Sequence, residues 1–445
     1  MDIEEFVRKN LRNGVPENKI IEDGFKRILE FKDDKDLAIK FIKAVLEEVK
    51  NSERILELKD ETLKNILLYP KSGVKMGEAG VGSRGEGDFF VHREIARIIK
   101  SSKVRGIIDS EEQDDAGVVK AEGKYIIAAV DGTHSRLSEF PFIAGFHVAK
   151  AALRDIYVMG AKGLALLSDV HLADDGDVGK IFDFTAGVST VSDAVNVPLI
   201  GGSTLRIGGD MVLGERLVSS VTAIGGGDKI TARRNAKEGD IILMTEGSGG
   251  GTICSTAIYH GYFDVVYETL NVDFIKACQK LIDKGLVDKI DAMTDVTNGG
   301  LRGDAYEISK TAKVSLIFNK EALYKTINKK VLKMLEDLNI DFLGISTGSL
   351  LIICPEDIKD EIKKEINAIE VGYVEKGDKS YIEEDKKRVE LKPKFRESPY
   401  TPVKKVVDRD PKDFEELKEK IRKACDKAIE KKKMVLERIL NNSPY

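Results

Sequence analysis

Apolar residues recur at helical spacing near the start of the chain. Ala38, Ile42, Val45 and Val49 fall on one face of a helix, and Lys and Glu occupy the opposite face. The segments IIEDGFKRILEF and ETLKNILL show the same pattern, and Pro70 with the glycines after it ends the region. We therefore predict that residues 1–70 form a helical extension made of several short helices.

Residues 71–228 follow a different pattern. Segment 71–87, KSGVKMGEAGVGSRGEG, contains six glycines and predicts a loop. After it, short continuous apolar runs typical of buried strands alternate with helical segments. The predicted strands lie in KYIIAAV, LALLSDVHL, VPLIGG and RLVSSVTAIG, and the predicted helices lie in FIAGFHVAKAALRDIYVMGA and VGKIFDFTAGVSTVSDAV. Strands that alternate with helices predict an α/β or α+β layer architecture for this N-terminal domain.

A second α/β unit is predicted over residues 229–391. The turn-rich stretch GGGDKITARRNAKEGD marks its boundary near residue 230. The unit begins with the apolar run IILMTEG, and a glycine loop at Gly247–Gly251 follows. Its later segments are DAMTDVTNGGLRGDAYEI, the strand STGSLLIICP and hairpin-like strands that end near residue 391. This unit is the predicted C-terminal domain.

The tail, residues 392–445, is predicted to be a polar linker followed by a long helix. Pro393, Pro399 and Pro402 lie in the linker. Asp410 is the predicted N-cap of the helix, and Pro411 suits the first helical position. An apolar stripe along this helix indicates a packing or dimerisation element.

Composition excludes several classes of partner. The 445 residues are enough for two or three domains. With 71 basic and 76 acidic residues, a net charge of -5 gives no reason to expect a nucleic-acid or membrane-surface partner. The four cysteines form no CxxC pair, which favours a reducing cytoplasm over a disulfide framework. No apolar run approaches the roughly 20 residues of a membrane span.

Five aspartates are the candidate metal ligands. Asp131 and Asp295 each stand where an apolar run ends, and Asp155 has apolar neighbours inside a predicted helix. Asp114 and Asp115 are adjacent carboxylates, which repel each other unless water or a cation screens them. Magnesium takes oxygen ligands and often bridges carboxylates to substrate phosphates. Each aspartate also has a plain alternative role, as a turn, a cap or, for Asp155, an ion-pair partner of Arg154 or of a distant lysine.

Other residues could contact phosphates or take part in catalysis. The glycine loop could cradle phosphates with its backbone N–H groups, although it lacks the GxxxxGK[ST] pattern and could equally be a linker. Lys75, Arg84 and Arg93 are candidates to contact a γ-phosphate, with simple solvation as the alternative. Among the five histidines, His134 follows Asp131 closely and is the best candidate for the site, with a structural role as the alternative.

Several motifs resemble one family in order along the chain. DDAGVV resembles the Asp-Asp-Ala motif of thiamine monophosphate kinase, and AVDGTHS is similar to a stretch of aminoimidazole ribonucleotide (AIR) synthase. AALRDIYVMGAKGLALL looks like a segment of selenophosphate synthetase. VPLIGGST, MTDVTNGGL and STGSLLIICP resemble further motifs of the same superfamily. The matches cover roughly residues 75–375, and the chain is identified as a member of this superfamily.

The resemblance implies a fold and a site. Each protomer would have an N-terminal domain with a four-stranded sheet and a C-terminal α/β domain, and two N-terminal sheets would form a barrel-like homodimer. ATP with Mg²⁺ would lie in a cleft near the dimer interface. The aspartates match the family's metal ligands by position. The implied nucleotide-binding residues are Gly82, Gly85, Gly87, Asp131, Gly132, Thr133, Gly201 and Gly202.

Two functions follow from these observations. The first is an ATP- and magnesium-dependent phosphotransferase or synthetase that activates a small molecule of unknown identity. Selenide activation is not expected, because the loop at 71–87 contains no cysteine where selenophosphate synthetase has a reactive one. The second is a nucleotide-binding scaffold without turnover, whose helical extensions recruit a protein partner.

Overall fold

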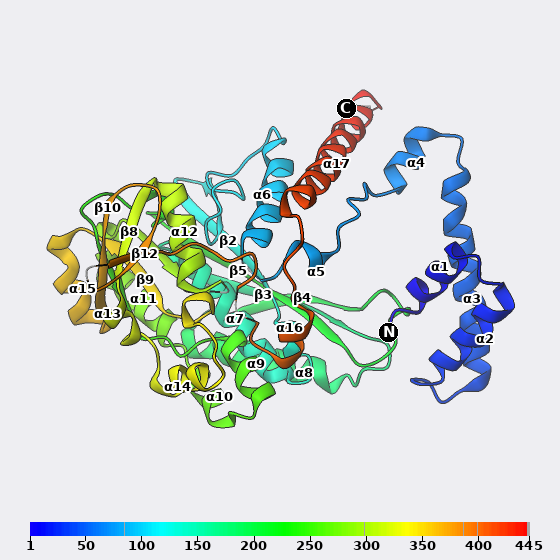
Figure 1. Cartoon of the computed structure of the whole chain (residues 1–445), viewed down its shortest axis with the longest axis horizontal. Coiled ribbons are helices and arrows are strands. Elements are labelled where there is room, and N and C mark those ends of the chain that lie inside the picture. The colour runs from blue at the N-terminus through cyan, green and yellow to red at the C-terminus, as the bar shows by residue number, and fades with distance from the viewer. Residues whose placement is uncertain (84, 298, 386, 398, 443–445) are drawn as a thin grey trace.

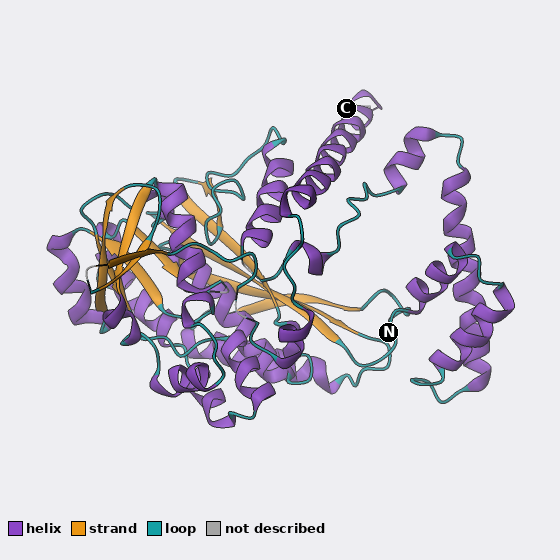
Figure 2. Ribbon diagram, viewed as in Figure 1, coloured by secondary structure: helices purple, strands orange, loops and turns teal. Residues whose placement is uncertain are grey.

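Two sheets and a separate group of N-terminal helices make up the fold. The computed structural model describes residues 1–83, 85–297, 299–385, 387–397 and 399–442. Figure 1 shows the two sheet-containing parts next to each other, with the N-terminal helices at the end farther from the C-terminal sheet. Figure 2 shows helices packed around both sheets.

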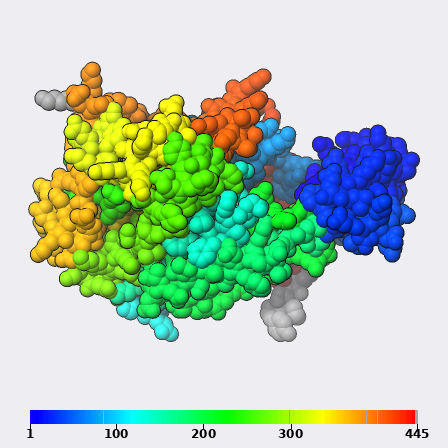
Figure 3. Space-filling model, turned by 90° about the horizontal axis from the view of Figure 1, so that it is seen from below, coloured from blue at the N-terminus to red at the C-terminus, as the bar shows by residue number. Residues whose placement is uncertain are grey.

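The N-terminal helices form a small lobe with its own core. They are α1 (Ile3–Arg12), α2 (Glu17–Ile28), α3 (Lys35–Glu53) and α4 (Glu61–Leu67). In the space-filling view this lobe projects from one end of the molecule (Figure 3). Buried Ile3, Ile20 and Val45 belong to one apolar cluster, which Leu213 from the β4–β5 loop also joins. Lys32 adds an ion pair with Asp175 of 2.7 Å, so the lobe is fixed to the N-terminal sheet by apolar and charged contacts.

Within the described residues, the N-terminal sheet has five strands. They are β1 (Gly117–Ala121), β2 (Lys124–Gly132), β3 (Lys162–Leu172), β4 (Leu199–Arg206) and β5 (Leu217–Gly227), in the spatial order β1-β2-β5-β3-β4. The expectation of four strands is therefore wrong. The additional strand, β1, pairs with β2 through a tight turn in which Glu122 and Gly123 both have positive φ. The described strands form an open sheet, and the barrel-like dimer stays a prediction.

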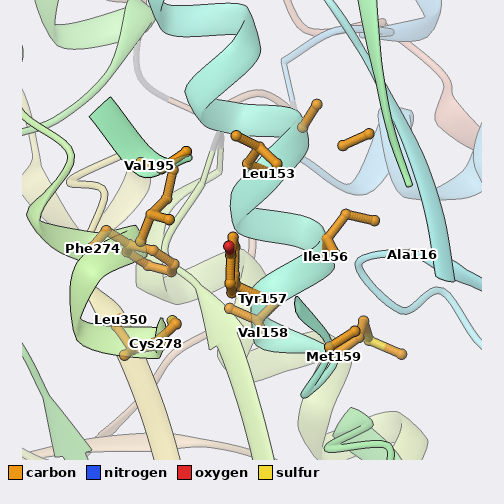
Figure 4. Close-up of a cluster of buried hydrophobic side chains, with 14 of the residues drawn as sticks. Ala116, Leu153, Ile156, Tyr157, Val158, Met159, Val195, Phe274, Cys278 and Leu350 are labelled. Atoms are coloured by element: carbon orange, nitrogen blue, oxygen red, sulfur yellow. The ribbon is translucent and has the colours of Figure 1, made fainter. Parts of the chain in front are cut away.

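Three helices pack near this sheet. They are α6 (Glu86–Lys100), α7 (Pro141–Val158) and α8 (Gly179–Val195). α7 and α8 approach closely, since a Cβ added at Gly145 would lie 2.1 Å from the Phe184 carbonyl oxygen. Buried Leu153, Ile156 and Tyr157 of α7 belong to the main core (Figure 4). A helix buried on nearly all sides can carry a polar residue only where that residue has a partner or a function.

The glycine-rich segment is not entirely a loop. A short helix, α5 (Met76–Ala79), lies within it, and α6 already begins at Glu86. The prediction of a loop over the whole of residues 71–87 is therefore wrong at these two places. Gly80 ends α5 with a φ of 72°, a left-handed conformation that glycine adopts without strain.

The C-terminal sheet has seven strands in the part of the chain that the structure describes. They are β6 (Ile241–Met244), β7 (Ala292–Asp295), β8 (Val314–Asn319), β9 (Leu350–Cys354), β10 (Ile369–Lys376), β11 (Tyr381–Glu384) and β12 (Lys387–Glu390), in the spatial order β12-β11-β8-β10-β6-β9-β7. Its helices are α9 (Gly251–His260), α10 (Phe263–Thr269), α11 (Asp273–Asp283), α12 (Gly300–Ala312), α13 (Lys320–Tyr324), α14 (Lys329–Asp337) and α15 (Lys359–Ile366). β7 forms one edge of this sheet and contacts α7, which brings the two domains together.

The segment after the second sheet crosses back to the N-terminal domain. We call residues 391–397 the strap. Its Lys394 carbonyl oxygen accepts a hydrogen bond of 2.9 Å from the Glu86 N–H at the start of α6. Its Glu397 forms an ion pair of 3.0 Å with Arg302 of the C-terminal domain. The strap therefore connects the glycine-rich segment to the C-terminal domain.

The chain continues through α16 (Pro402–Val407) into α17 (Phe414–Asn442), which packs on α6. The predicted N-cap, Asp410, is wrong: the helix begins at Phe414, and Asp413 accepts a hydrogen bond of 2.9 Å from the Glu416 N–H. Near the middle of α17, buried Cys425 donates a hydrogen bond of 3.2 Å to the Glu94 carbonyl oxygen of α6. Among the helices that the structure describes, none has the length and apolar character needed to cross a membrane.

Candidate active site

All five predicted aspartates line one cavity of about 740 Å³. Asp114 and Asp115 precede β1, and Asp131 lies near the end of β2. Asp155 extends from the buried helix α7, and Asp295 ends β7 of the C-terminal domain. Residues separated by up to 181 positions thus meet between the two domains, with α7 as the element that both domains contact.

Three of these carboxylates are close enough to share one ion. Oxygen atoms of Asp115, Asp155 and Asp295 all lie within 4.8 Å of one another. Octahedral ligands at about 2.1 Å from Mg²⁺ lie up to roughly 4 Å apart, so a small inward movement would bring the three oxygens into one coordination sphere. The donor set is made only of oxygen atoms, which suits Mg²⁺ better than a thiophilic metal. These residues therefore fit a divalent magnesium ion.

Burial and mutual repulsion make the carboxylates costly to ionise. Burial, together with the charge of Asp115, raises the pKa of Asp114 to about 7. Burial also raises the pKa of Asp115 to about 6, although Arg233 opposes this effect. The pKa of Asp155 lies well above its usual value because of burial and the charges of Asp131 and Asp295. A bound cation would remove this electrostatic cost.

Two buried arginines hold members of the cluster in place. Arg154 Nε lies 3.1 Å from Asp295 Oδ2, and both side chains are almost fully buried. Arg233 donates to Asp115 Oδ1 at 2.6 Å and to Glu307 Oε2 at 2.7 Å, and its backbone N–H donates to Asp114 Oδ2 at 3.1 Å. The predicted alternative of an Asp155–Arg154 ion pair is not what the structure shows, since the partner of Arg154 is Asp295.

The predicted phosphate-contacting residues are only partly brought together. Gly82 and Gly132 line the cavity, whereas Thr133 is bonded to Ser219 through its backbone N–H at 2.8 Å. Gly85 and Gly87 instead lie against the strap, where a Cβ at Gly85 would meet the Lys394 carbonyl oxygen at 2.4 Å. Their lack of side chains thus has a packing reason that the sequence did not reveal.

Other predicted site residues lie away from the cavity. Gly201 and Gly202 are on the exposed edge strand β4, outside the cavity lining of the described chain. Lys75 and Arg93 are exposed and also lie outside the lining. Arg84, the remaining predicted basic residue, falls outside the described residues. Of the predicted basic γ-phosphate contacts, the two that the structure describes, Lys75 and Arg93, therefore lie outside the site of a single chain.

His134 lines the cavity, as predicted, but it is bonded on both sides. Its Nε2 lies 2.5 Å from the Tyr400 hydroxyl, and its Nδ1 lies 3.1 Å from Ser255 Oγ. Burial, with Lys404 and Arg136 nearby, lowers the pKa of His134 to about 4. The ring is therefore neutral near pH 7 and suits orientation by hydrogen bonds better than donation of a proton.

Sequence reasoning missed several residues of the cavity. His147 and Arg154 lie seven positions apart on one face of α7, and Arg154 directly precedes Asp155, so a helical projection could have indicated that this face borders the site. Arg233 lies in the turn-rich stretch that was interpreted only as a domain boundary. No periodic pattern marks Arg233, because its role depends on contacts with residues more than 60 positions away.

Comparisons with known proteins agree with the motif order. The family profile "AIR synthase related protein, N-terminal domain" matches residues 113–226, and "AIR synthase related protein, C-terminal domain" matches residues 237–385.

Among the similar proteins, one matches this chain over almost its whole length, and two others match it at lower sequence identity. "Uncharacterized protein MJ1416" of Methanocaldococcus jannaschii is 72% identical over 98% of this chain and 98% of its own length. "Selenide, water dikinase" of the same organism is 25% identical over 62% of this chain and 85% of its own length. The crystal structure of hydrogenase maturation protein HypE in complex with ATP is similar with a TM-score of 0.52 and 17% identity, over 68% of this chain and 92% of that chain.

Proposed function

This chain belongs to the AIR synthase-related family, and from that premise we propose that it uses ATP with Mg²⁺ to activate a small-molecule acceptor. The relatives support the use of ATP, since a selenide, water dikinase is similar in sequence and a HypE structure of similar fold contains ATP. The acceptor is a separate question, because these relatives are similar at only 25% and 17% identity.

The observation that carries the proposal is the convergence of the five aspartates in one cavity. Burying several carboxylates without compensation costs many kcal/mol, and two arginines offset only part of their charge. A divalent ion bound by these carboxylates would offset the rest of their charge, and the ion could in turn bind a triphosphate. Structural ion pairs alone would not require Asp155, which lies in a buried helix near three other carboxylates.

The residues have distinct parts in the proposed reaction. Asp115, Asp155 and Asp295 would hold Mg²⁺, which when bound neutralises phosphate charge and orients the phosphates. Arg233 keeps Asp115 in place, and Arg154 keeps Asp295 in place. Gly82 leaves the cavity wall open to a close approach by a ligand, since a Cβ there would meet no atom within 4 Å. Between the domains, the cavity can limit the access of water to the transferred group.

Calorimetric titration with Mg²⁺ and the ATP analogue AMPPCP tests the site. We expect micromolar binding to the unchanged chain and at least a tenfold loss for Asp155→Asn, because that change removes one anionic metal ligand. Asp193→Asn, on the exposed surface of α8, is the matched control and should bind as tightly as the unchanged chain. Equal affinity of Asp155→Asn and the control would contradict the assignment of the metal site.

We also propose that two copies associate through the uncovered face of the N-terminal sheet. Val119, Val130, Leu205 and Val218 are exposed apolar side chains on its strands. Val130 also lines the cavity, so a second copy on this face would border the nucleotide site.

All four cysteines are unpaired and buried, and on this basis we propose that the protein works in a reducing cytoplasm.

A scaffold without turnover is the second candidate function. It is favoured by the N-terminal lobe, which lies outside both matched family segments. Exposed Leu56, Leu67 and Tyr69 near the end of that lobe could contact a protein partner. A stoichiometric partner that copurifies with the chain, together with no release of ADP over a broad set of acceptors, would favour the scaffold.

A further inference from the structure

The cavity has an inner end that the nucleotide and metal assignments do not use. Helix α9 begins there, and Gly251 and Thr252 of its first turn line the cavity. The start of a helix presents backbone N–H groups and a partial positive charge, which together favour an anion.

Arg154 adds a full positive charge at the same place. The residue is only 5% exposed, and its Nε already contacts Asp295 of the metal cluster. Its two terminal nitrogens lie next to Gly348 and Gly250. A Cβ added at Gly348 would lie 3.1 Å from Nη1, and a Cβ added at Gly250 would lie 3.9 Å from Nη2. The guanidinium therefore lies between the metal cluster and the start of α9, where it could bind an oxyanion with two N–H groups.

His147 supplies a hydrogen-bond acceptor beside these positive groups. Its Nε2 lies 3.3 Å from Thr269 Oγ1, and that hydroxyl donates its proton to the Val266 carbonyl oxygen at 2.7 Å. This arrangement favours the tautomer with the proton on Nε2, which leaves Nδ1 as an acceptor. Burial, with Lys150 and Arg154 nearby, keeps the pKa of His147 well below its usual value, so the ring is neutral at pH 7.

The acceptor nitrogen of His147 has no partner within the described part of the chain. The residue is only 4% exposed and lines the cavity, yet no described donor reaches Nδ1. A Cβ added at Gly251 would lie 3.7 Å from the Cβ of His147, which places the ring next to the start of α9. An unpaired buried acceptor costs free energy, and a ligand with a donor group would recover it.

We propose that this inner end binds the acceptor substrate, and that the substrate presents an oxyanion next to a hydroxyl or amine donor. The oxyanion would contact Arg154 and the start of α9, and the donor would bond to His147 Nδ1. This inference rests on the proposed function, because it places the acceptor beside the metal cluster that would hold the nucleotide. The monoanion of a phosphate monoester, which keeps one P–OH group, and a hydroxy acid both have this chemistry.

Four small probes test the proposal on the full chain, first saturated with Mg²⁺ and AMPPCP so that the nucleotide site is filled. Hydrogen phosphate and glycolate each carry an oxyanion and an O–H donor, whereas sulfate and acetate at pH 7 carry only the oxyanion. We expect phosphate to bind at least fivefold more tightly than sulfate, or glycolate at least fivefold more tightly than acetate. The pair that shows the preference identifies the source of the oxyanion as phosphate or carboxylate.

Variants then locate the preference. His147→Leu should remove the advantage of the donor-bearing probe and leave the affinity for sulfate or acetate within about twofold. His260→Leu, at the opposite end of α9 and outside the cavity lining, is the matched control and should keep the preference. Arg154→Gln should weaken every probe, because it removes the charge that all four share.

The outcomes separate this inference from the proposed function. Binding of Mg²⁺ and AMPPCP without binding of any probe, or equal affinities within both probe pairs in the unchanged chain, would overturn the acceptor subsite alone. Failure of Mg²⁺ and AMPPCP to bind would overturn the proposed function and the subsite with it. The ranking of probes on the unchanged chain decides the matter even if a variant folds poorly.

Discussion

At the scale of single residues, the site depends on charges that the fold brings together at a cost. Arg233 is fully buried and contacts Asp115, Asp304 and Glu307, which come from both domains. Burial alone would lower the pKa of Arg233, but these three carboxylates raise it, so the guanidinium stays charged. The surplus of carboxylates over arginines remains, and this surplus has a measurable effect on stability.

Without metal, the contribution of Asp114 and Asp115 to stability should fall as the pH rises from about 4 to 7. Their pKa values are raised to about 7 and 6, so these two carboxyls bind more protons in the folded state than in the unfolded state in this range. Each such group lowers the free energy of unfolding by up to about 1.4 kcal/mol per pH unit as the pH rises through the window. Thermal unfolding in EDTA at several pH values measures this slope.

Asp115→Asn tests the effect, because it removes one carboxyl and also the charge that helps to raise the pKa of Asp114, while the His134 ring is kept. Its melting temperature in EDTA should depend less on pH than that of the unchanged chain, and added Mg²⁺ should stabilise it less. An identical pH slope in the two proteins would show that these carboxyls do not control stability.

At the scale of elements, α7 and the strap position the site. α7 carries Asp155, Arg154 and His147 inside the interface between the domains. The strap holds the start of α6 next to the cavity through backbone contacts that only glycine permits. These two elements explain why the cavity walls come from distant parts of the chain.

Gly85→Ala should destabilise the contact between the strap and α6. A Cβ there would lie 2.4 Å from the carbonyl oxygens of both Lys394 and Phe395, so the backbone must move. Overpacking of this kind costs about 1–3 kcal/mol, which thermal or urea unfolding can measure. Gly77→Ala is the control, since a Cβ at Gly77 meets no atom within 4 Å. Equal stability of the two variants would mean that the strap contact is loose in solution.

At the scale of the whole molecule, the proposed association through the N-terminal sheet can be tested directly. Leu205 on the edge strand β4 is 58% exposed, and Leu205→Lys would place a charge on the proposed contact surface. We expect sedimentation to show a dimer for the unchanged chain and a monomer for this variant. Val389→Lys, at a similarly exposed position on β12, is the control and should stay dimeric. A monomeric unchanged chain would rule out the dimer.

The sequence was informative where a local pattern determines the structure. Continuous apolar runs located β2 to β5, and motif order located the five aspartates that the cavity unites. The sequence was uninformative where the role of a residue depends on contacts with distant parts of the chain. β1 was missed because its Gly117–Ala121 segment is short and mostly exposed, and the apolar signal of a buried strand is therefore weak. Arg233 and the strap contact of Gly85 depend on partners more than 60 positions away.

The packing of α17 on α6 controls the access of reagents to the thiol of Cys425. Cys254, Cys278 and Cys354 are enclosed in the main body, whereas Cys425 is shielded only where α17 rests on α6. A thiol reagent should therefore modify Cys425 first, at the rate at which α17 lifts away, and mass spectrometry after timed quenching would identify the labelled peptide. Simultaneous modification of all four sulfhydryls would instead mean that α17 separates only when the entire protein unfolds.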